Sequence, residues 1–370
     1  MILHLIPDEK FADYVICQFA SSNMKSHLVL VTSGRAQMVK EYAKTQVLTF
    51  DSEAFQNLLQ NLSQYSAVIF HGLFWPWQER VLNAIPSTVK IAWMFWGGEI
   101  YGRKNMQGKF LSHSSKVLLN LRNLKQTISL RGIRFTKYHI PIDYLMKIDY
   151  CLTDMSMECE YANRYLHHSM QMLWYNYYSI EDMIGETLLH ECCAGNGIFI
   201  GNSATIENNH LDVFFDLKHL PIGGHKLVVP LSYGALWYKN VIHRVGHILF
   251  GRQFQPLLHF IERSDYNHIM LSCNTMIMPH YRAQAQGNII TGLWLGMRVY
   301  LYEQNFAYQY FRGLGVKIYS INEDMNKHNP NLFAPMTRED IAHNRSILLH
   351  VYGQEAIMNA VRNIVNTLDK

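Results

Sequence analysis

Short apolar runs alternate with amphipathic stretches through the first half of the chain. The runs, each too short for a helix, are residues 2–6, 27–32, 47–50, 67–70, 89–96 and 150–152. Between them, apolar residues recur at helical spacing from Glu9, from Ser52, around residues 77–85 and over residues 157–167. Strands that alternate with helices in this way indicate βαβ units around a parallel sheet.

The second half repeats this alternation. The predicted strands or apolar pieces are residues 198–200, 225–233, 268–273, 275–280, 298–303 and 316–321. The predicted helices are residues 209–219, 236–249, 256–263, 288–295 and 306–313, followed by two helices divided near Gly353. Residues 173–194 have no clean period, so we interpret them as a linker with short turns.

A length of 370 residues suits two α/β domains of ordinary size better than one very large domain. We predict a first Rossmann-like domain over residues 1–190 and a second over residues 191–345, with parallel sheets that face a central cleft. Residues 346–370 are predicted to form a helix that crosses back to the first domain.

The stretch "GIFIGNSATIENNHLDVFF", residues 197–215, predicts a place where a ligand binds. Residues 197–200 are typical of a buried parallel strand, and a polar loop follows them. Asn208 or Asn209 can then serve as the N-cap of a helix that starts there. Ligands of open α/β sheets bind at such strand ends, near helix N-termini.

Composition narrows the class of protein. Charged residues make up 17% of the chain and hydrophobic residues 49%, which is typical of a folded protein. No stretch approaches the ~20 apolar residues that span a bilayer, and the N-terminus lacks the features of a signal peptide. The six cysteines include no CxxC pair. We therefore expect a cytoplasmic protein.

Positive charge is concentrated in one segment. Residues 100–142 contain nine Lys or Arg and no Asp or Glu. Within it, residues 108–131 predict an amphipathic basic helix, which we place in the first domain. Such a helix suits anionic lipid headgroups or a diphosphate. A solvated basic face above a core-facing stripe is the alternative, and we do not expect a nucleic-acid partner.

Five motifs in order resemble one family of glycosyltransferases. They are "VIFHGLFWP" (68–76), "WMFWGGEIYG" (93–102), "FIGNSATIENNH" (199–210), "LVVPLSYG" (227–234) and "QGNIITGLWLGMRVYL" (286–301). Together they resemble the TDP-Fuc4NAc:lipid II Fuc4NAc transferases of enterobacterial common antigen synthesis. The resemblance implies a GT-B fold and transfer of a deoxyamino sugar to a polyprenyl-diphosphate-linked saccharide. In this chain, Glu99 stands where the family's pattern has Asp.

Transfer from a nucleotide diphosphosugar requires stabilisation of the charge that develops on the leaving diphosphate. Arg282 and Gln286 precede Gly287 and Asn288, which begin a predicted helix. A glycine lets backbone N–H groups approach phosphates, and the helix dipole adds partial positive charge. We predict the diphosphate site here. The alternative is an ordinary helix-start glycine beside a surface arginine.

Further donor contacts are predicted at neighbouring strand ends. The candidates are Asn202 and Ser203, Ser232 and Tyr233, and also Glu303, which is placed to contact the ribose. Many retaining GT-B enzymes carry a ribose-binding Glu at the position that Thr291 occupies here. A deoxyribose lacks the 2′ hydroxyl, so this difference is compatible with a thymidine nucleotide.

The first domain offers His71 and Glu99, which both follow predicted strands. In an inverting enzyme either side chain can take the proton of the acceptor hydroxyl, and in a retaining enzyme they would position acceptor and sugar. A histidine after a strand is also often a structural residue. Trp93, Trp96 and Tyr101 are candidates to stack on acceptor sugars, or to pack in the core.

No Asp-x-Asp pair stands at a strand end, and His243 and His247 lack an evident third ligand. We therefore expect no metal and no other cofactor. The prediction is a glycosyltransferase, peripheral on the cytoplasmic side of the inner membrane. It would use a TDP- or UDP-sugar and a polyprenyl-diphosphate-linked acceptor, and bind the anionic membrane surface through the basic helix. A nucleotide-sugar epimerase on the same fold and a bilobal binding protein without chemistry are the alternatives.

Overall fold

The structure is a computed structural model that describes residues 1–21, 25–106, 108–128 and 138–370. By its internal contacts the chain divides into two compact units. The first unit comprises Met1–Gln107, Phe135–Ser179 and Tyr352–Lys370, and the second comprises Gly108–Arg134 and Ile180–Val351. Each unit contains one parallel sheet, so the predicted α/β class with two Rossmann-like units is confirmed.

The first sheet has seven strands in the order β3-β2-β1-β4-β5-β6-β7. They are β1 (Ile2–Pro7), β2 (Ser26–Thr32), β3 (Gln46–Thr49), β4 (Ala67–Phe70), β5 (Lys90–Met94), β6 (Tyr150–Thr153) and β7 (Gln171–Trp174). In the register, Leu3 of β1 pairs with His27 of β2 and with Val68 of β4. The strand order reverses at β1, and His71 and Glu99 follow two strands on one side of that point.

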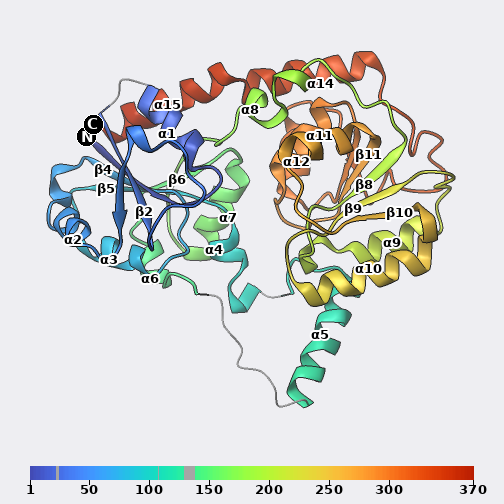
Figure 1. Cartoon of the computed structure of the whole chain (residues 1–370), viewed down its shortest axis with the longest axis horizontal. Helices are drawn as coiled ribbons and strands as arrows, with labels where there is room; N and C mark the ends of the chain where they lie inside the picture. Colours follow the sequence, from blue (N-terminus) through green and yellow to red (C-terminus); the bar gives the residue numbers. More distant parts are fainter. Residues whose placement is uncertain (22–24, 107, 129–137) are drawn as a thin grey trace. The chain divides into compact units, whose positions relative to one another are not determined.

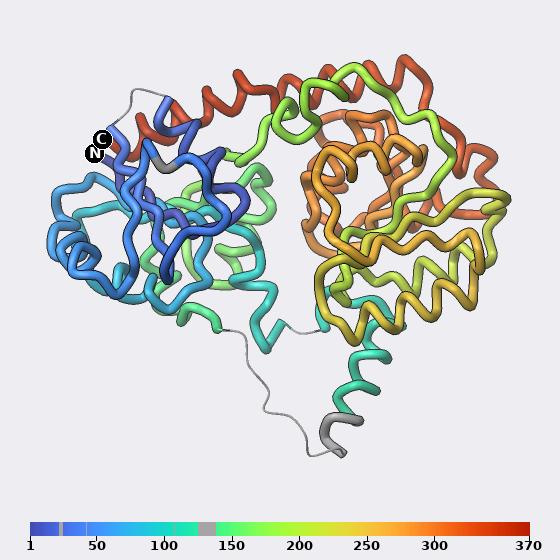
Figure 2. Tube along the Cα trace, in the orientation of Figure 1, coloured from blue at the N-terminus to red at the C-terminus, as the bar shows by residue number. Residues whose placement is uncertain are grey.

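Helices cover both faces of this sheet (Figure 1). They are α1 (Ala12–Ser21), α2 (Glu53–Gln60), α3 (Trp77–Ala84), α4 (Gly98–Tyr101), α6 (Ile142–Leu145), α7 (Ser156–Leu166) and α15 (Gln354–Leu368). The last helix packs against α1 and β7, and Val361, Ile364 and Leu368 are buried in the core of the first unit. Figure 2 shows this red segment beside the blue start of the chain. The Met1 amino group lies 2.8 Å from the Asp369 carboxylate.

The second sheet has six strands in the order β10-β9-β8-β11-β12-β13. They are β8 (Gly197–Ile200), β9 (Leu227–Pro230), β10 (Phe254–Leu257), β11 (Cys273–Met278), β12 (Arg298–Leu301) and β13 (Tyr319–Ser320). The helices of this unit are α5 (His113–Ile128), α8 (Ile180–Ile184), α9 (His210–Lys218), α10 (Leu236–Phe250), α11 (Arg263–Leu271), α12 (Gln286–Trp294), α13 (Phe306–Gly313) and α14 (Arg338–Tyr352). Figure 1 shows α9 and α10 on one face of the sheet and α11 and α12 on the other.

Single 3₁₀ turns complete the elements. They are η1 (Tyr42–Lys44), η2 (Leu62–Gln64), η3 (Lys104–Met106), η4 (Glu186–Leu188), η5 (Ile206–Asn208) and η6 (Gly251–Gln253). Of these, η5 lies in the polar loop between β8 and α9 and presents side chains of the candidate site.

Helix α5 packs with the second unit, although the sequence analysis placed the basic helix in the first domain. It contacts α9, and Leu118 packs against the core of the second unit. The Arg122 guanidinium lies over the Trp237 ring, 4.5 Å from its centroid. Amphipathic spacing predicts that a helix has a buried face, but it does not say which domain covers that face.

Two predicted segments have a different structure. Residues 256–263 were predicted to be helical, but Phe254–Leu257 form the edge strand β10 and the next helix begins at Arg263. Pro256 is tolerated there because an edge strand does not need every N–H for the sheet. Residues 173–194, predicted to be a linker, contain the end of β7 and the short helix α8.

Candidate functional site

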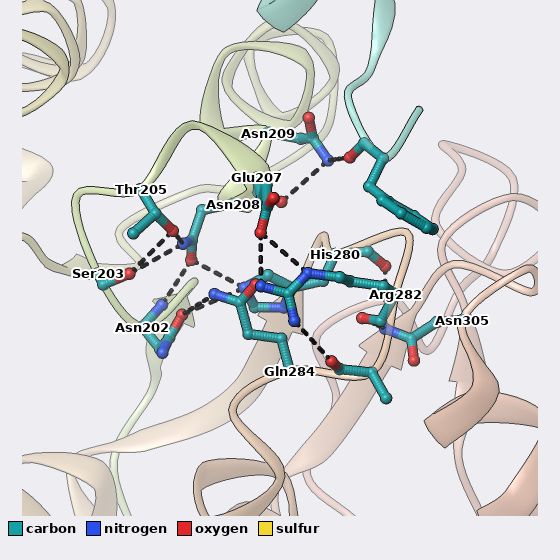
Figure 3. Close-up of polar contacts among 12 residues, drawn as sticks. Asn202, Ser203, Thr205, Glu207, Asn208, Asn209, His280, Arg282, Gln284 and Asn305 are labelled. Carbon is teal, nitrogen blue, oxygen red and sulfur yellow. Dashed lines mark hydrogen bonds and ion pairs between the residues drawn. The ribbon is translucent and has the colours of Figure 1, made fainter. Parts of the chain in front are cut away.

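The polar loop after β8 begins with a sharp turn at Gly201. This residue has a φ of +67°, and a Cβ atom there would lie 2.6 Å from both Asn208 Oδ1 and His210 Nε2. Both the conformation and the close approach therefore require glycine. The turn brings the loop back over the end of the strand, where it forms a network of hydrogen bonds (Figure 3).

Asn208 is at the centre of this network and is fully buried. Its Nδ2 donates to Ser203 Oγ at 3.1 Å and to Thr205 Oγ1 at 2.8 Å. Its Oδ1 accepts from the Asn202 backbone N–H at 2.8 Å and from His280 Nε2 at 3.0 Å. One side chain thus fixes the loop and joins it to the segment that follows β11.

Asn209 occupies the N-cap position of α9, as predicted, but its side chain does not cap the helix. The residue has a left-handed backbone with a φ of 47°. Its Oδ1 accepts from the Ser112 backbone N–H at 2.8 Å, and its Nδ2 donates to the carbonyl oxygens of Pro279 at 2.9 Å and Phe110 at 3.3 Å. Asn209 therefore ties the segment before α5 to both loops of the site.

His280 and Gln284 belong to the same network and were not predicted from the sequence. His280 Nε2 also donates to Asn202 Oδ1 at 3.2 Å, and Gln284 Nε2 donates to that oxygen at 3.3 Å. His280 Nδ1 and Gln284 Oε1 are buried and have no hydrogen-bond partner among the described residues. Burial, together with the charge of Arg282, holds the pKa of His280 well below its usual range, so the ring is neutral.

A second buried histidine, His210, starts helix α9 and was also not predicted. Its Nδ1 and its backbone N–H both lie 3.2 Å from the Tyr238 hydroxyl. Burial lowers the pKa of His210 to about 3, and its Nε2 has no partner in the described part of the chain.

Arg282 forms an ion pair with Glu207 of the turn η5. Its Nη2 lies 2.6 Å and its Nε 2.9 Å from Glu207 Oε2. The Arg282 side chain is 15% exposed, so it is not an ordinary surface charge. Asn305, the N-cap of α13, donates to the carbonyl oxygens of His280 and Arg282, both at 2.9 Å, and so ties this loop to the start of α13.

The start of α12 lies directly after this loop. Ala285 is the N-cap residue with a φ of 57°, a conformation that non-glycine residues adopt rarely, and Gln286 is the first helical residue. Gly287 is exposed, and a Cβ there would meet nothing within 4 Å, so packing does not require this glycine. Asn288 donates to the Tyr266 hydroxyl at 2.9 Å.

Tyr233 lies in the loop that follows β9, at the carboxyl end of this strand. The Tyr233 hydroxyl accepts from Asn202 Nδ2 at 2.8 Å, while the side chain as a whole is 58% exposed. Ser232 is half-buried beside it. Glu303 is joined instead to β13, since its carboxylate accepts from Ser320 Oγ at 2.7 Å.

In the first unit, Glu99 is the second residue of the short helix α4, and only 1% of its surface is exposed. Its Oε1 accepts from the Trp93 indole N–H at 3.1 Å and from the Leu73 backbone N–H at 3.3 Å. Its Oε2 is buried without a hydrogen-bond partner among the described residues. Burial raises the pKa of Glu99 to about 7, although the donated hydrogen bonds oppose the rise.

His71 directly follows β4 and is fully buried. Its Nε2 lies 3.2 Å from His4 Nδ1 of β1, and its ring stacks with those of Phe11 and His4. Burial lowers the pKa of His71 to about 3. The ring is therefore neutral at physiological pH.

Three aromatic rings in the loops after β4 and β5 are partly exposed, namely Phe74, Trp75 and Trp96. Phe74 and Trp75 lie near Trp96, with ring centroids 5.3 and 6.1 Å from it. Trp96 also donates from its indole to the Tyr177 hydroxyl at 3.0 Å. By contrast, Trp93 is fully buried and Tyr101 is 2% exposed, so neither presents a face on which a sugar would stack.

In the described ranges no group of three His, Cys, Asp or Glu side chains is arranged to hold a metal ion. No helix within those ranges is both long and apolar enough to cross a bilayer.

Solved structures with a similar fold are glycosyltransferases of the GT-B class. Sucrose-phosphate synthase from Thermosynechococcus elongatus is 11% identical, with a TM-score of 0.63 over 100% of this chain and 99% of its own. A glycosyltransferase from Rickettsia africae is also 11% identical, with a TM-score of 0.64 over 99% and 98%. Anabaena HepE, solved in complex with UDP and glucose, is 11% identical, with a TM-score of 0.60 over 99% and 98%.

The chain therefore has the GT-B fold, as the sequence analysis predicted. No protein-family model matches the chain, and no curated protein sequence matches it. At these identities the likeness establishes the fold alone.

Proposed function

We propose that this protein is a glycosyltransferase that uses a nucleotide-sugar donor. The observation that carries the proposal is the polar network in which side chains from the β8–α9 loop, the β9 end and the β11–α12 loop converge. These loops stand at the carboxyl ends of parallel strands, where open α/β sheets bind ligands. Similarity to GT-B structures, one of them with bound UDP and glucose, supports the same interpretation.

In this proposal, Arg282 and the first N–H groups of α12 bind the donor diphosphate. The helix dipole and the guanidinium together supply positive charge where the leaving group becomes more negative. Ala285, which has a left-handed backbone, connects the loop that carries Arg282 to the start of this helix. Asn202, Ser203, Ser232, Tyr233, Gln286, Gly287 and Asn288 are proposed to contact the rest of the donor, with Glu303 at the ribose. No metal is needed in this scheme.

Glu99 is the proposed catalytic base. A pKa near 7 suits a group that accepts a proton at physiological pH, and a buried carboxylate oxygen without a partner is free to accept it. The acceptor hydroxyl, or one water between them, must come within hydrogen-bond distance of Oε2. His71 is proposed to position the acceptor as a neutral ring, because a pKa of about 3 makes it a weak base.

For the acceptor, we propose a polyprenyl-diphosphate-linked saccharide at an anionic membrane. The sugar that we propose to be transferred is Fuc4NAc or a similar deoxyamino sugar, and its donor is the TDP- or UDP-linked form. Helix α5 supports the membrane part, since Val117, Leu121 and Leu124 are 44–59% exposed at helical spacing on a helix without acidic residues. Basic helices with exposed apolar residues bind anionic lipid surfaces. The location is then the cytoplasmic face of the inner membrane.

The test is thermal stabilisation of the full chain by TDP, UDP, GDP and ADP, with and without Mg²⁺. A ligand that binds only the native state raises the unfolding temperature. We expect a selective shift with TDP or UDP that Mg²⁺ does not change. A shift with none of the four nucleotides would contradict the proposal.

Turnover separates the alternatives once a donor is known. A glycosyltransferase releases the nucleotide only when acceptor is present. An epimerase would change the sugar of the donor without any acceptor, and a binding protein would do neither.

A further inference from the structure

The ion pair between Glu207 and Arg282 joins the two loops that hold the proposed donor site. It reaches from the turn η5 after β8 to the loop after β11. The two side chains are 26% and 15% exposed, so the pair is screened less than a surface ion pair but is still accessible from solvent. Figure 3 shows the Glu207 carboxylate directed at the guanidinium.

Both residues of the pair are held by their neighbours. Glu207 is followed by Asn208 and Asn209, which are fully buried and bonded through their side chains. Arg282 is held at its carbonyl oxygen by Asn305. These hydrogen bonds hold the backbone of both loops. The Glu207 carboxylate therefore occupies a defined place in front of the Arg282 guanidinium.

The charges of these loops sum to zero. Residues 201–210 contain Glu207 as their one formally charged residue, and residues 279–288 contain only Arg282, while the histidines of both segments are neutral. A diphosphate carries at least two negative charges. It would therefore meet an arginine that is already neutralised, with a carboxylate beside it.

We propose that Glu207 is a built-in counter-ion that occupies the place of a donor phosphate on Arg282 and yields it to the donor diphosphate. This rests on the proposed function. In the free protein Glu207 keeps the guanidinium in position, and on binding the phosphate oxygens replace the carboxylate as its partner. Glu207 is thus a positioning residue that acts through Arg282, and it weakens the binding of anionic ligands.

Glu207→Gln tests the charge while it keeps the shape of the side chain, and the amide oxygen can still accept a hydrogen bond from Arg282. Affinities for TDP, UDP and inorganic pyrophosphate are measured by calorimetry on the full chain. Removal of the competing carboxylate should tighten all three by about tenfold. Affinity for the uncharged nucleosides thymidine and uridine should not change.

The gain should depend on Arg282. In the Arg282→Gln background, Glu207→Gln should no longer tighten binding, because the two changes act on one interaction. Asp340→Asn is the matched control, since Asp340 pairs with Lys317 in the same unit and is not part of this site. It should leave the three affinities unchanged.

The outcomes distinguish this inference from the proposed function. If the wild type binds nucleotides but Glu207→Gln binds them equally or more weakly, the counter-ion role is wrong and the donor site stands. An equal gain for nucleosides would also overturn it. If neither protein binds any of the three anions, the donor site itself is wrong and both proposals fail.

Discussion

Acid should destabilise this protein through four fully buried histidines, two in each unit. They are His4 and His71 in the first unit and His210 and His280 in the second. Burial lowers the pKa of His71 and of His210 to about 3, and holds the pKa of His4 and His280 well below 6.5. Below pH 6.5 the unfolded chain therefore binds protons that the folded chain does not, so stability falls as the pH falls.

The size of the loss differs between the units. Well below pH 6.5 each such histidine contributes a loss of ~1.4 kcal/mol per pH unit. From pH 6.5 to 5.5 it contributes ~1 kcal/mol, because the unfolded histidine is only half protonated at pH 6.5. Glu99 opposes this in the first unit, because burial raises its pKa to about 7 and the folded state binds its proton first. Between pH 7 and the ordinary carboxyl pKa, Glu99 adds ~1.4 kcal/mol of stability for each unit by which the pH falls. From pH 6.5 to 5.5, where Glu99 offsets ~1.2 kcal/mol in the first unit, these groups should cost the first unit ~0.8 kcal/mol and the second ~2 kcal/mol.

Urea unfolding at pH 7.5, 6.5 and 5.5, followed by hydrogen exchange with mass spectrometry, measures both units in one protein. Peptides from β1 and β4 report the first unit, and peptides from β8 and β11 report the second. In Glu99→Gln the opposing contribution of this carboxyl group is absent, so the stability loss of the first unit from pH 6.5 to 5.5 should rise to ~2 kcal/mol. Equal stability at pH 6.5 and 5.5, or an unchanged loss in Glu99→Gln, would refute this account of the buried groups.

Two further predictions concern the proposed chemistry and its location. Glu99→Gln should lower kcat by ~10²–10⁴-fold with little change in nucleotide affinity. The wild-type kcat should rise with pH around 7, because the Glu99 carboxylate must lose its proton to act as a base. Full turnover in the variant would exclude the base role. Lys109→Gln and Lys116→Gln should each weaken binding to anionic vesicles by about fivefold, measured by flotation, and salt should weaken the wild type too. Equal binding of the wild type to neutral vesicles would contradict the electrostatic part.

The parallel sheets were predictable because buried strands leave short apolar runs that a helix cannot explain. The predicted strands of residues 2–6, 67–70 and 198–200 agree closely with β1, β4 and β8. β10 was missed because Gln255 and Pro256 make a short edge strand look irregular. The partner of α5 was not predictable, since it depends on contacts of Asn209 and Trp237 far along the chain.

The candidate site was predictable only where polar residues follow an apolar run. Asn202 and Tyr233 follow β8 and β9 and do meet in the structure. His280 is also a polar residue that follows an apolar run, since it stands two residues after β11. Glu207 could have been noticed as the one charged residue of its loop. Their importance arises from the folding of loops against each other, which spacing along the chain does not encode.

The return of α15 to the first sheet bears on how the protein is made. Translation delivers β1 to β7 early, but Val361, Ile364 and Leu368, which pack in that core, leave the ribosome only after all strands of the second unit. Domains generally fold in the order of synthesis, and here the second unit has all its strands and can fold before the first is finished. A nascent chain stalled after residue 351 would therefore expose the apolar surface that α15 covers, and would be a natural client for chaperones.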